Sequence, residues 1–125
     1  MNHDDKTIEN LLDLNGDRFV VDEKLGLWVK FEARRTTVTN DRPHGVRYSL
    51  TLHDKSGKRI LGFDNAHAIE YERKGKVKPK RTYYHWHKDV DDVGRPYEYR
   101  NAGNLLEDFW KEVEKVLKRL QEERS

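Results

Sequence analysis

Two segments in which apolar and polar residues alternate strictly constrain the fold more than any other feature of the chain. From Leu27 to Arg34 every odd position is apolar, and the even positions carry Trp28 and three charged residues. Residues 46–53 repeat the pattern, with apolar or tyrosine side chains at even positions and polar ones between them. Successive side chains of a strand point to opposite faces, so each segment predicts a half-buried strand of an antiparallel sheet. We expect these strands to cover residues 27–38 and 46–53.

Shorter signals complete the expected sheet. Residues 19–21 and 59–63 are predicted as strands, and Asp54–Lys58 is a hairpin-type loop between the second and third main strands. Residues 82–87 form the last expected strand. The basic stretch 70–81 is predicted as an exposed loop or hairpin tip, and residues 89–96 as a connecting loop.

An amphipathic helix is expected at the C-terminus. Asn104 can cap it, with Glu107 three residues later completing a capping box. Apolar residues then recur every three or four positions, at Leu106, Phe109, Trp110, Val113, Val116, Leu117 and Leu120. The sequence therefore predicts one α+β domain over residues 1–125, an antiparallel sheet of about five strands with this helix on one face. Residues 1–14 are expected to be flexible or a short helix, capped by Thr7.

Composition excludes several classes of protein. The 125-residue chain contains no cysteine, which rules out disulfide scaffolds, thiolate catalysis, cysteine-ligated zinc and iron–sulfur clusters. The start at Met1–Lys6 lacks a basic region followed by an apolar one, and no apolar run approaches the ~20 residues that span a bilayer. We expect a cytoplasmic protein without membrane association. Phosphate-binding, dinucleotide-binding, serine-esterase and zinc-protease motifs are also missing from the sequence.

Reactive side chains concentrate in two segments, Asp64–His67 and Tyr83–Lys88. On a strand, Tyr83, His85 and His87 would share one face, and Tyr84 and Trp86 the other. We expect the second pair to lie under the helix, which leaves the histidines on the open face where a substrate or metal can reach them. If strands 59–63 and 82–87 are neighbours, His67 approaches the pair.

Three chemistries suit these residues. Two imidazoles, as base and acid, can cleave a phosphodiester without a metal, and Lys88 can stabilise the developing charge. His85 and His87 with His67 or Asp64 can ligate a metal ion. Alternatively, the imidazoles and Tyr83 can bind nucleic acid without catalysis. A purely structural interpretation remains open: His-x-His as solvated strand surface, and Asp64–Asn65 as a turn.

Charge is unevenly distributed although the formal net charge is only +2. Residues 71–88 carry seven basic residues and one acid, whereas residues 1–24 carry seven acids and three bases. A basic run beside aromatic residues is typical of nucleic-acid binding, although a solvated loop has the same composition. The candidate substrate-binding residues of this run are Arg73, Lys74, Lys76, Lys78, Lys80, Arg81 and Tyr83.

The order of these motifs resembles the TumE-type toxins of prokaryotic toxin–antitoxin modules. The matching pieces are residues 63–67, residues 84–88 and the helix from Asn104 to Leu117, within a resemblance over roughly residues 16–120. The basic stretch 71–81 is longer than expected for the family. The resemblance implies a toxin that is neutralised by a small helix-turn-helix antitoxin encoded beside it, and makes ribonuclease activity a plausible expectation.

The leading hypothesis is accordingly a toxin that cleaves RNA without a metal or another cofactor. His85 and His87 would act as acid and base, His67 would assist them, and Lys88, Asp64 and Asn65 would line the site. A non-enzymatic nucleic-acid- or protein-binding module and a histidine-ligated metal protein are the alternatives. Trp110, at the edge of the helix stripe, could contact a second chain in a homodimer, although burial in the core is the simpler role.

Overall fold

The structure is a computed structural model, and it describes residues 6–40, 42–65, 69–71, 80–82, 84–88 and 94–124. The elements are α1 (Ile8–Asp13), β1 (Arg18–Asp22), β2 (Leu27–Arg35), β3 (Val46–His53), β4 (Arg59–Asp64), β5 (Ile69–Tyr71), β6 (Lys80–Thr82), β7 (His85–His87), β8 (Arg95–Pro96) and α2 (Ala102–Arg124).

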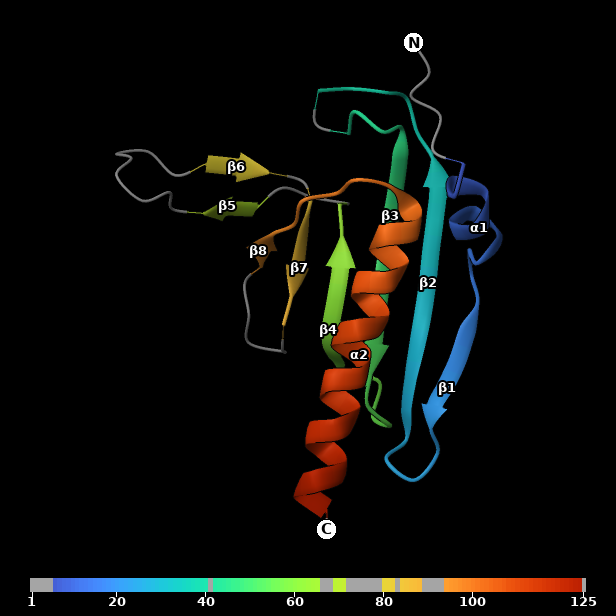
Figure 1. The fold of residues 1–125 in the computed structure, drawn as a ribbon, viewed down its shortest axis with the longest axis vertical. Coiled ribbons are helices and arrows are strands. Elements are labelled where there is room, and N and C mark those ends of the chain that lie inside the picture. The colour runs from blue at the N-terminus through green and yellow to red at the C-terminus, as the bar shows by residue number, and fades with distance from the viewer. Residues whose placement is uncertain are drawn as a thin grey trace.

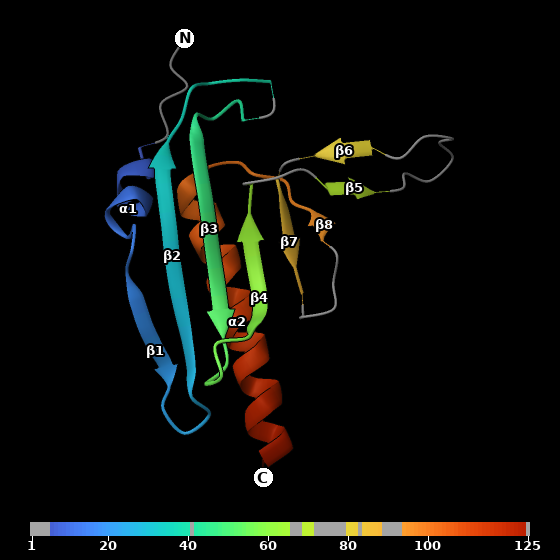
Figure 2. The same ribbon diagram turned by 180° about the vertical axis from the view of Figure 1, so that it is seen from behind.

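Six strands form one antiparallel sheet in the order β1-β2-β3-β4-β7-β8, and β5 and β6 form a separate two-stranded hairpin. Helix α2 runs along one face of the large sheet, with α1 beside it near β2 (Figure 1). From behind, the strands lie in front of α2 and no described element covers this second, open face (Figure 2). The predicted α+β architecture is confirmed, with six strands rather than about five and an additional small hairpin.

The core lies between the sheet and α2. The apolar positions of the alternating segments are buried, including Phe31 and Leu50, whose side chains are at most 1% exposed. Phe109 of α2 contacts both Phe31 and Phe63 edge-on, with ring centroids 5.7 and 6.0 Å apart. The amphipathic patterns of sheet and helix therefore meet as predicted. No helix of the described chain is long and apolar enough to cross a membrane.

Helix α2 begins earlier than the sequence predicts. Asn101 caps it, since the backbone N–H of Asn104 donates to Asn101 Oδ1 at 2.8 Å. Thr7, predicted to cap the N-terminal turn, makes no side-chain cap there; its Oγ1 instead accepts from the N–H of Gly103 at 2.8 Å. Asn104 as the cap was therefore wrong, because a residue distant in sequence completes the true start. The earlier start adds Ala102, which is fully buried, and Leu105, which the predicted stripe did not include, is fully buried as well.

The strand limits differ most near the histidines. The strand over residues 46–53 is confirmed, but the one predicted over 27–38 ends at Arg35. The last strand, expected over 82–87, is divided: Thr82 belongs to β6 and β7 begins at His85. Beyond it, β8 lies inside the predicted loop 89–96 and pairs with β7. The ends of the basic stretch pair as the β5–β6 hairpin, and residues 72–79 between them lie outside the described residues.

Candidate functional site

The register of the strands arranges polar residues in rows across the open face of the sheet. One row consists of Glu32, Ser49, Asp64 and His85, each directly opposite the next on neighbouring strands. The adjacent row consists of Lys30, Thr51, Gly62 and His87. Directly paired residues point to the same face, so residues from four strands converge there.

Asp64, His85 and His87 form a buried polar cluster at one end of these rows. Their exposed fractions are 5%, 0% and 5%. His85 Nε2 lies 3.3 Å from Asp64 Oδ1, and the two imidazole rings meet edge-on with centroids 4.9 Å apart. One potential ligand atom from each residue lies within 4.8 Å of the others. The cluster could therefore hold a metal ion, or act as a pair of imidazoles with a carboxylate close to one of them.

The predicted division of faces in the histidine strand is confirmed. Trp86 stacks on Phe63 beneath α2, with ring centroids 5.3 Å apart, and Tyr84 is 8% exposed. The two histidines lie on the opposite face, but the prediction that they are open to solvent was wrong, because both are buried. The rings are removed from solvent by their packing against neighbouring side chains, which include each other, with centroids 4.9 Å apart, and Asp64.

Asn65 supports the cluster from the end of β4. Its Nδ2 donates to the carbonyl of Val46 at 2.8 Å, and its Oδ1 accepts from the N–H of Tyr48 at 2.9 Å. Its own backbone N–H donates to the carbonyl of Tyr48 at 3.2 Å. The side chain is fully buried and prolongs the β3–β4 ladder by imitating a strand backbone. Asn65, the residue after Asp64, thus fixes where β4 ends.

A cleft of about 560 Å³ lies beside the cluster on the open face. The side chains that border it along the rows are Glu32, Arg34, Arg47, Ser49 and Asp64; Asn15, Ala33 and Tyr48 complete the lining. Ser49 has a small side chain and lies between the longer side chains of Glu32 and Arg47, which leaves space above it. Sequence reasoning did not select Arg34 and Arg47 as site residues. The signal was present, because both occupy the polar positions of the two alternating segments.

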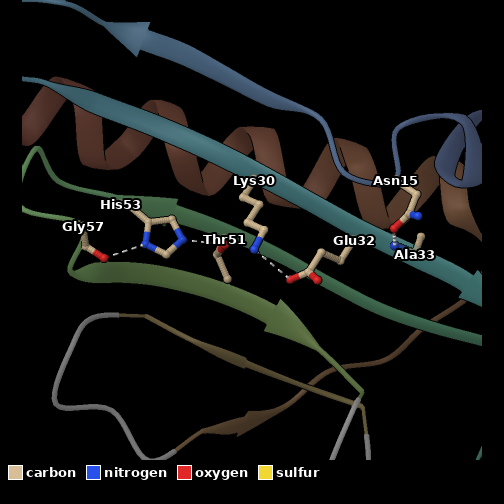
Figure 3. A network of polar contacts seen from close by, with 7 residues as sticks. All are labelled: Asn15, Lys30, Glu32, Ala33, Thr51, His53 and Gly57. Carbon is tan, nitrogen blue, oxygen red and sulfur yellow. Dashed lines mark hydrogen bonds and ion pairs between the residues drawn. The ribbon is translucent and has the colours of Figure 1, made fainter.

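Figure 3 looks onto this face, with α2 behind the sheet. Lys30 Nζ lies 3.5 Å from Glu32 Oε1, and Asn15 Oδ1 accepts from the N–H of Ala33 at 2.9 Å (Figure 3). The His53 ring is held by Thr51 Oγ1 at 2.8 Å and by the carbonyl of Gly57 at 3.0 Å (Figure 3). These contacts stabilise the strand and hairpin geometry around the cleft, and His53 lies outside the buried cluster.

The aromatic side chains on the other side of β3 remain uncharged at neutral pH. Burial raises the pKa of Tyr48 well above its ordinary value, and neighbouring tyrosines and Asp64 raise it further. Tyr48 stacks on Tyr99 with centroids 5.8 Å apart. Burial also raises the pKa of Tyr84, which lies 6.2 Å from Tyr48 between ring centroids. A neutral aromatic layer therefore supports the sheet beneath the site.

The remaining predicted site residues divide into two groups. Lys88 follows β7 and its side chain is exposed, in contrast to the buried cluster. Lys80 and Arg81 belong to β6, of which only the backbone is described. The predictions for His67, Arg73, Lys74, Lys76, Lys78 and Tyr83 lie outside the described residues.

Comparison with known proteins gives one match. The family model described as Toxin TumE matches residues 14–117, which include the six-stranded sheet, the buried cluster and most of α2. No curated protein and no solved structure matches the chain.

Proposed function

Because the chain belongs to the TumE toxin family, we propose that it is the toxin of a toxin–antitoxin module and cleaves RNA without a metal ion. Family membership implies an antitoxin partner in general. We propose further that this partner is a small helix-turn-helix protein, and that the toxin can pair with a second copy of itself. The observation that carries the proposal is the convergence of Asp64, His85 and His87 beside a cleft lined by two arginines.

In the proposed reaction RNA first gains access to the buried histidine pair, and one histidine then removes the proton from a 2′-hydroxyl group. The 2′-oxygen then bonds to the adjacent phosphorus, the bond from phosphorus to the 5′-oxygen breaks, and the second histidine gives a proton to that oxygen. The products are a 2′,3′-cyclic phosphate and a 5′-hydroxyl, and RNA itself supplies the nucleophile. Asp64 Oδ1, 3.3 Å from His85 Nε2, would stabilise the positive charge that this ring gains when it takes up a proton.

The other proposed residues would act around this centre. Lys88 would stabilise negative charge on the phosphorus-bound oxygens. His67 would assist the histidine pair, and Asn65 would keep Asp64 in register. Tyr83 and the basic residues from Arg73 to Arg81 would hold the RNA strand.

Expression in a bacterial host, with and without the antitoxin, tests the proposal. We expect the toxin alone to stop growth and degrade RNA, and His85→Asn and His87→Asn to abolish both effects. His53→Gln on the same face is the matched control and should remain toxic. Circular dichroism and capture by the antitoxin show whether each variant folds. If a folded His85→Asn/His87→Asn double variant is as toxic as the wild type, the proposed chemistry is wrong.

The spacing of the three buried residues also favours a second candidate function, metal binding. Ligand atoms within 4.8 Å of one another suit a site of two histidines and one carboxylate. Elemental analysis of the purified protein and RNA cleavage in the presence of a chelator separate the candidates. Bound metal at one equivalent, with activity lost on chelation, would favour the metal site over acid–base chemistry by free histidines.

A further inference from the structure

We infer that Arg34 and Arg47 form a phosphate-binding subsite for a single RNA strand, an inference that rests on the RNA-cleaving function proposed above. The two arginines lie directly opposite each other on β2 and β3. Both line the cleft next to Asp64. Neither belongs to the basic run that the sequence suggests for RNA binding.

The pairing of two arginines is unfavourable unless an anion lies near them. Like charges directly opposite on neighbouring strands destabilise a sheet. Arg34 is exposed and Arg47 half-buried, and within the described residues neither side chain has an ion pair or a hydrogen bond. Within the described residues neither carboxylate of the neighbouring row forms an ion pair with these arginines: Glu32 pairs with Lys30, and Asp64 Oδ1 lies 3.3 Å from His85 Nε2. An anion bound between the guanidinium groups would remove the repulsion.

A phosphate diester fits these two groups. Guanidinium groups bind phosphate oxygens through paired N–H donors and keep their charge at any physiological pH. The cleft volume of about 560 Å³ lies within the range of about 300–1,000 Å³ that is typical of small-ligand sites. It therefore accommodates a nucleotide-sized part of a strand rather than a duplex.

The subsite lies one row away from the row of paired residues that ends at His85. Arg47 is two residues from Ser49 on β3, a distance of about 7 Å along a strand. Ser49 is directly opposite Asp64, which is directly opposite His85. A strand held by the arginines at one phosphate would thus pass over Ser49 to reach Asp64 and the buried cluster. The subsite would fix the register of the substrate and would not take part in the chemical step.

The test measures binding without cleavage. A fluorescent single-stranded RNA with 2′-O-methyl groups lacks the attacking hydroxyl, so its binding by the full chain can be followed by anisotropy. We expect Arg34→Ala/Arg47→Ala to weaken binding by at least about tenfold. The slope of log K against log salt, taken between about 50 and 300 mM, should become less steep by about 1.4 for two lost phosphate contacts.

Lys118→Ala/Arg119→Ala is the control, since it removes two exposed cations from α2 and leaves the cleft intact. This variant should bind nearly as tightly as the wild type. Equal losses in the two double variants would indicate general charge attraction and overturn the subsite. Wild-type RNA binding by Arg34→Ala/Arg47→Ala, with loss of antitoxin capture, would instead identify the surface as a protein interface and also overturn it.

The experiments distinguish a failure of the proposed subsite from a failure of the proposed ribonuclease function. If the wild type fails to cleave unmodified RNA but its binding depends on Arg34 and Arg47, the subsite stands and the ribonuclease proposal fails. If cleavage depends on His85 and His87 but Arg34→Ala/Arg47→Ala binds RNA as tightly as the wild type, the subsite is wrong and the ribonuclease proposal stands.

Discussion

Replacement of Asn65 by alanine should destabilise the protein far more than the loss of one polar side chain suggests. The substitution removes two hydrogen bonds, to the carbonyl of Val46 and from the N–H of Tyr48. Val46 and Tyr48 are 0% and 1% exposed, so water has little access to the groups left behind. An unsatisfied buried donor or acceptor costs about 1–3 kcal/mol, so we expect a loss of about 2–4 kcal/mol in the free energy of unfolding after some relaxation.

Urea unfolding measures this loss, with Asn10→Ala as the control because Asn10 is exposed on α1. The control should change the free energy of unfolding by no more than about 0.5 kcal/mol. Asn65→Asp keeps the acceptor but loses the donor at neutral pH, so it should also destabilise, and should recover part of the loss as acid protonates the carboxyl and restores a donor. If Asn65→Ala lowers the free energy of unfolding by less than about 0.5 kcal/mol and leaves the m value unchanged, Asn65 does not stabilise the pairing of β3 with β4 in the way described.

Three further predictions concern the frame around the site. Gly26 and Gly57 both have a positive φ, at 71° and 89°. A Cβ at Gly26 would lie 2.4 Å from Lys55 Cβ, whereas a Cβ at Gly57 would meet nothing within 4 Å. In urea unfolding Gly57→Ala should therefore lower the free energy of unfolding by about 1–2 kcal/mol, and Gly26→Ala should lower it clearly more. Thr7→Val removes the acceptor for the Gly103 N–H and should cost about 1 kcal/mol in the same assay, whereas no loss would mean that water replaces the cap. Burial and the hydrogen bond to Asp108 raise the pKa of Tyr97, so the stability that this group contributes is present below its unfolded pKa of about 10 and is lost as pH rises above it. Tyr97→Phe should make the decline in stability between about pH 8 and 11 less steep, and an unchanged decline would contradict the assignment.

The main strands could be predicted because their information is local and repeated. From Leu27 to Arg34 in β2 and throughout β3 the burial of the side chains alternates with a period of two, and this alternation places Arg34 and Arg47 on the open face. The two-residue strand β8 could not be found this way, since Arg95–Pro96 is too short for a pattern and contains a residue without an N–H. Without β8 the sequence predicts residues 82–87 as the last strand, whereas it predicts accessible histidines because they lie on the face opposite the helix.

The start of α2 and the buried cluster depended on contacts between distant parts of the chain. Asn101 and Asn104 are equally good caps by residue type, and Thr7 contributes to the true start across 96 positions. The face of the sheet on which His85 and His87 lie could be predicted from the alternation of side chains along a strand alone. Their approach to Asp64 required the pairing of β4 with β7, which the intervening residues do not encode in any local pattern.

The position of Asp64 depends on how both ends of β4 are fixed. A register irregularity between Leu52 and His53 lies at the beginning of its pairing with β3, and the Asn65 amide closes the pairing at the other end. A slip of one residue would turn every β4 side chain to the opposite face. Asp64 would then point toward α2 and Phe63 toward the open face, which separates the carboxylate from His85 and exposes an aromatic core residue. Exposure of the Phe63 ring to solvent would cost much free energy, and this cost keeps the Asp64 carboxylate beside the His85 imidazole. The apolar packing of Phe63 against Phe109 therefore contributes to the geometry of the site as directly as the polar contacts do.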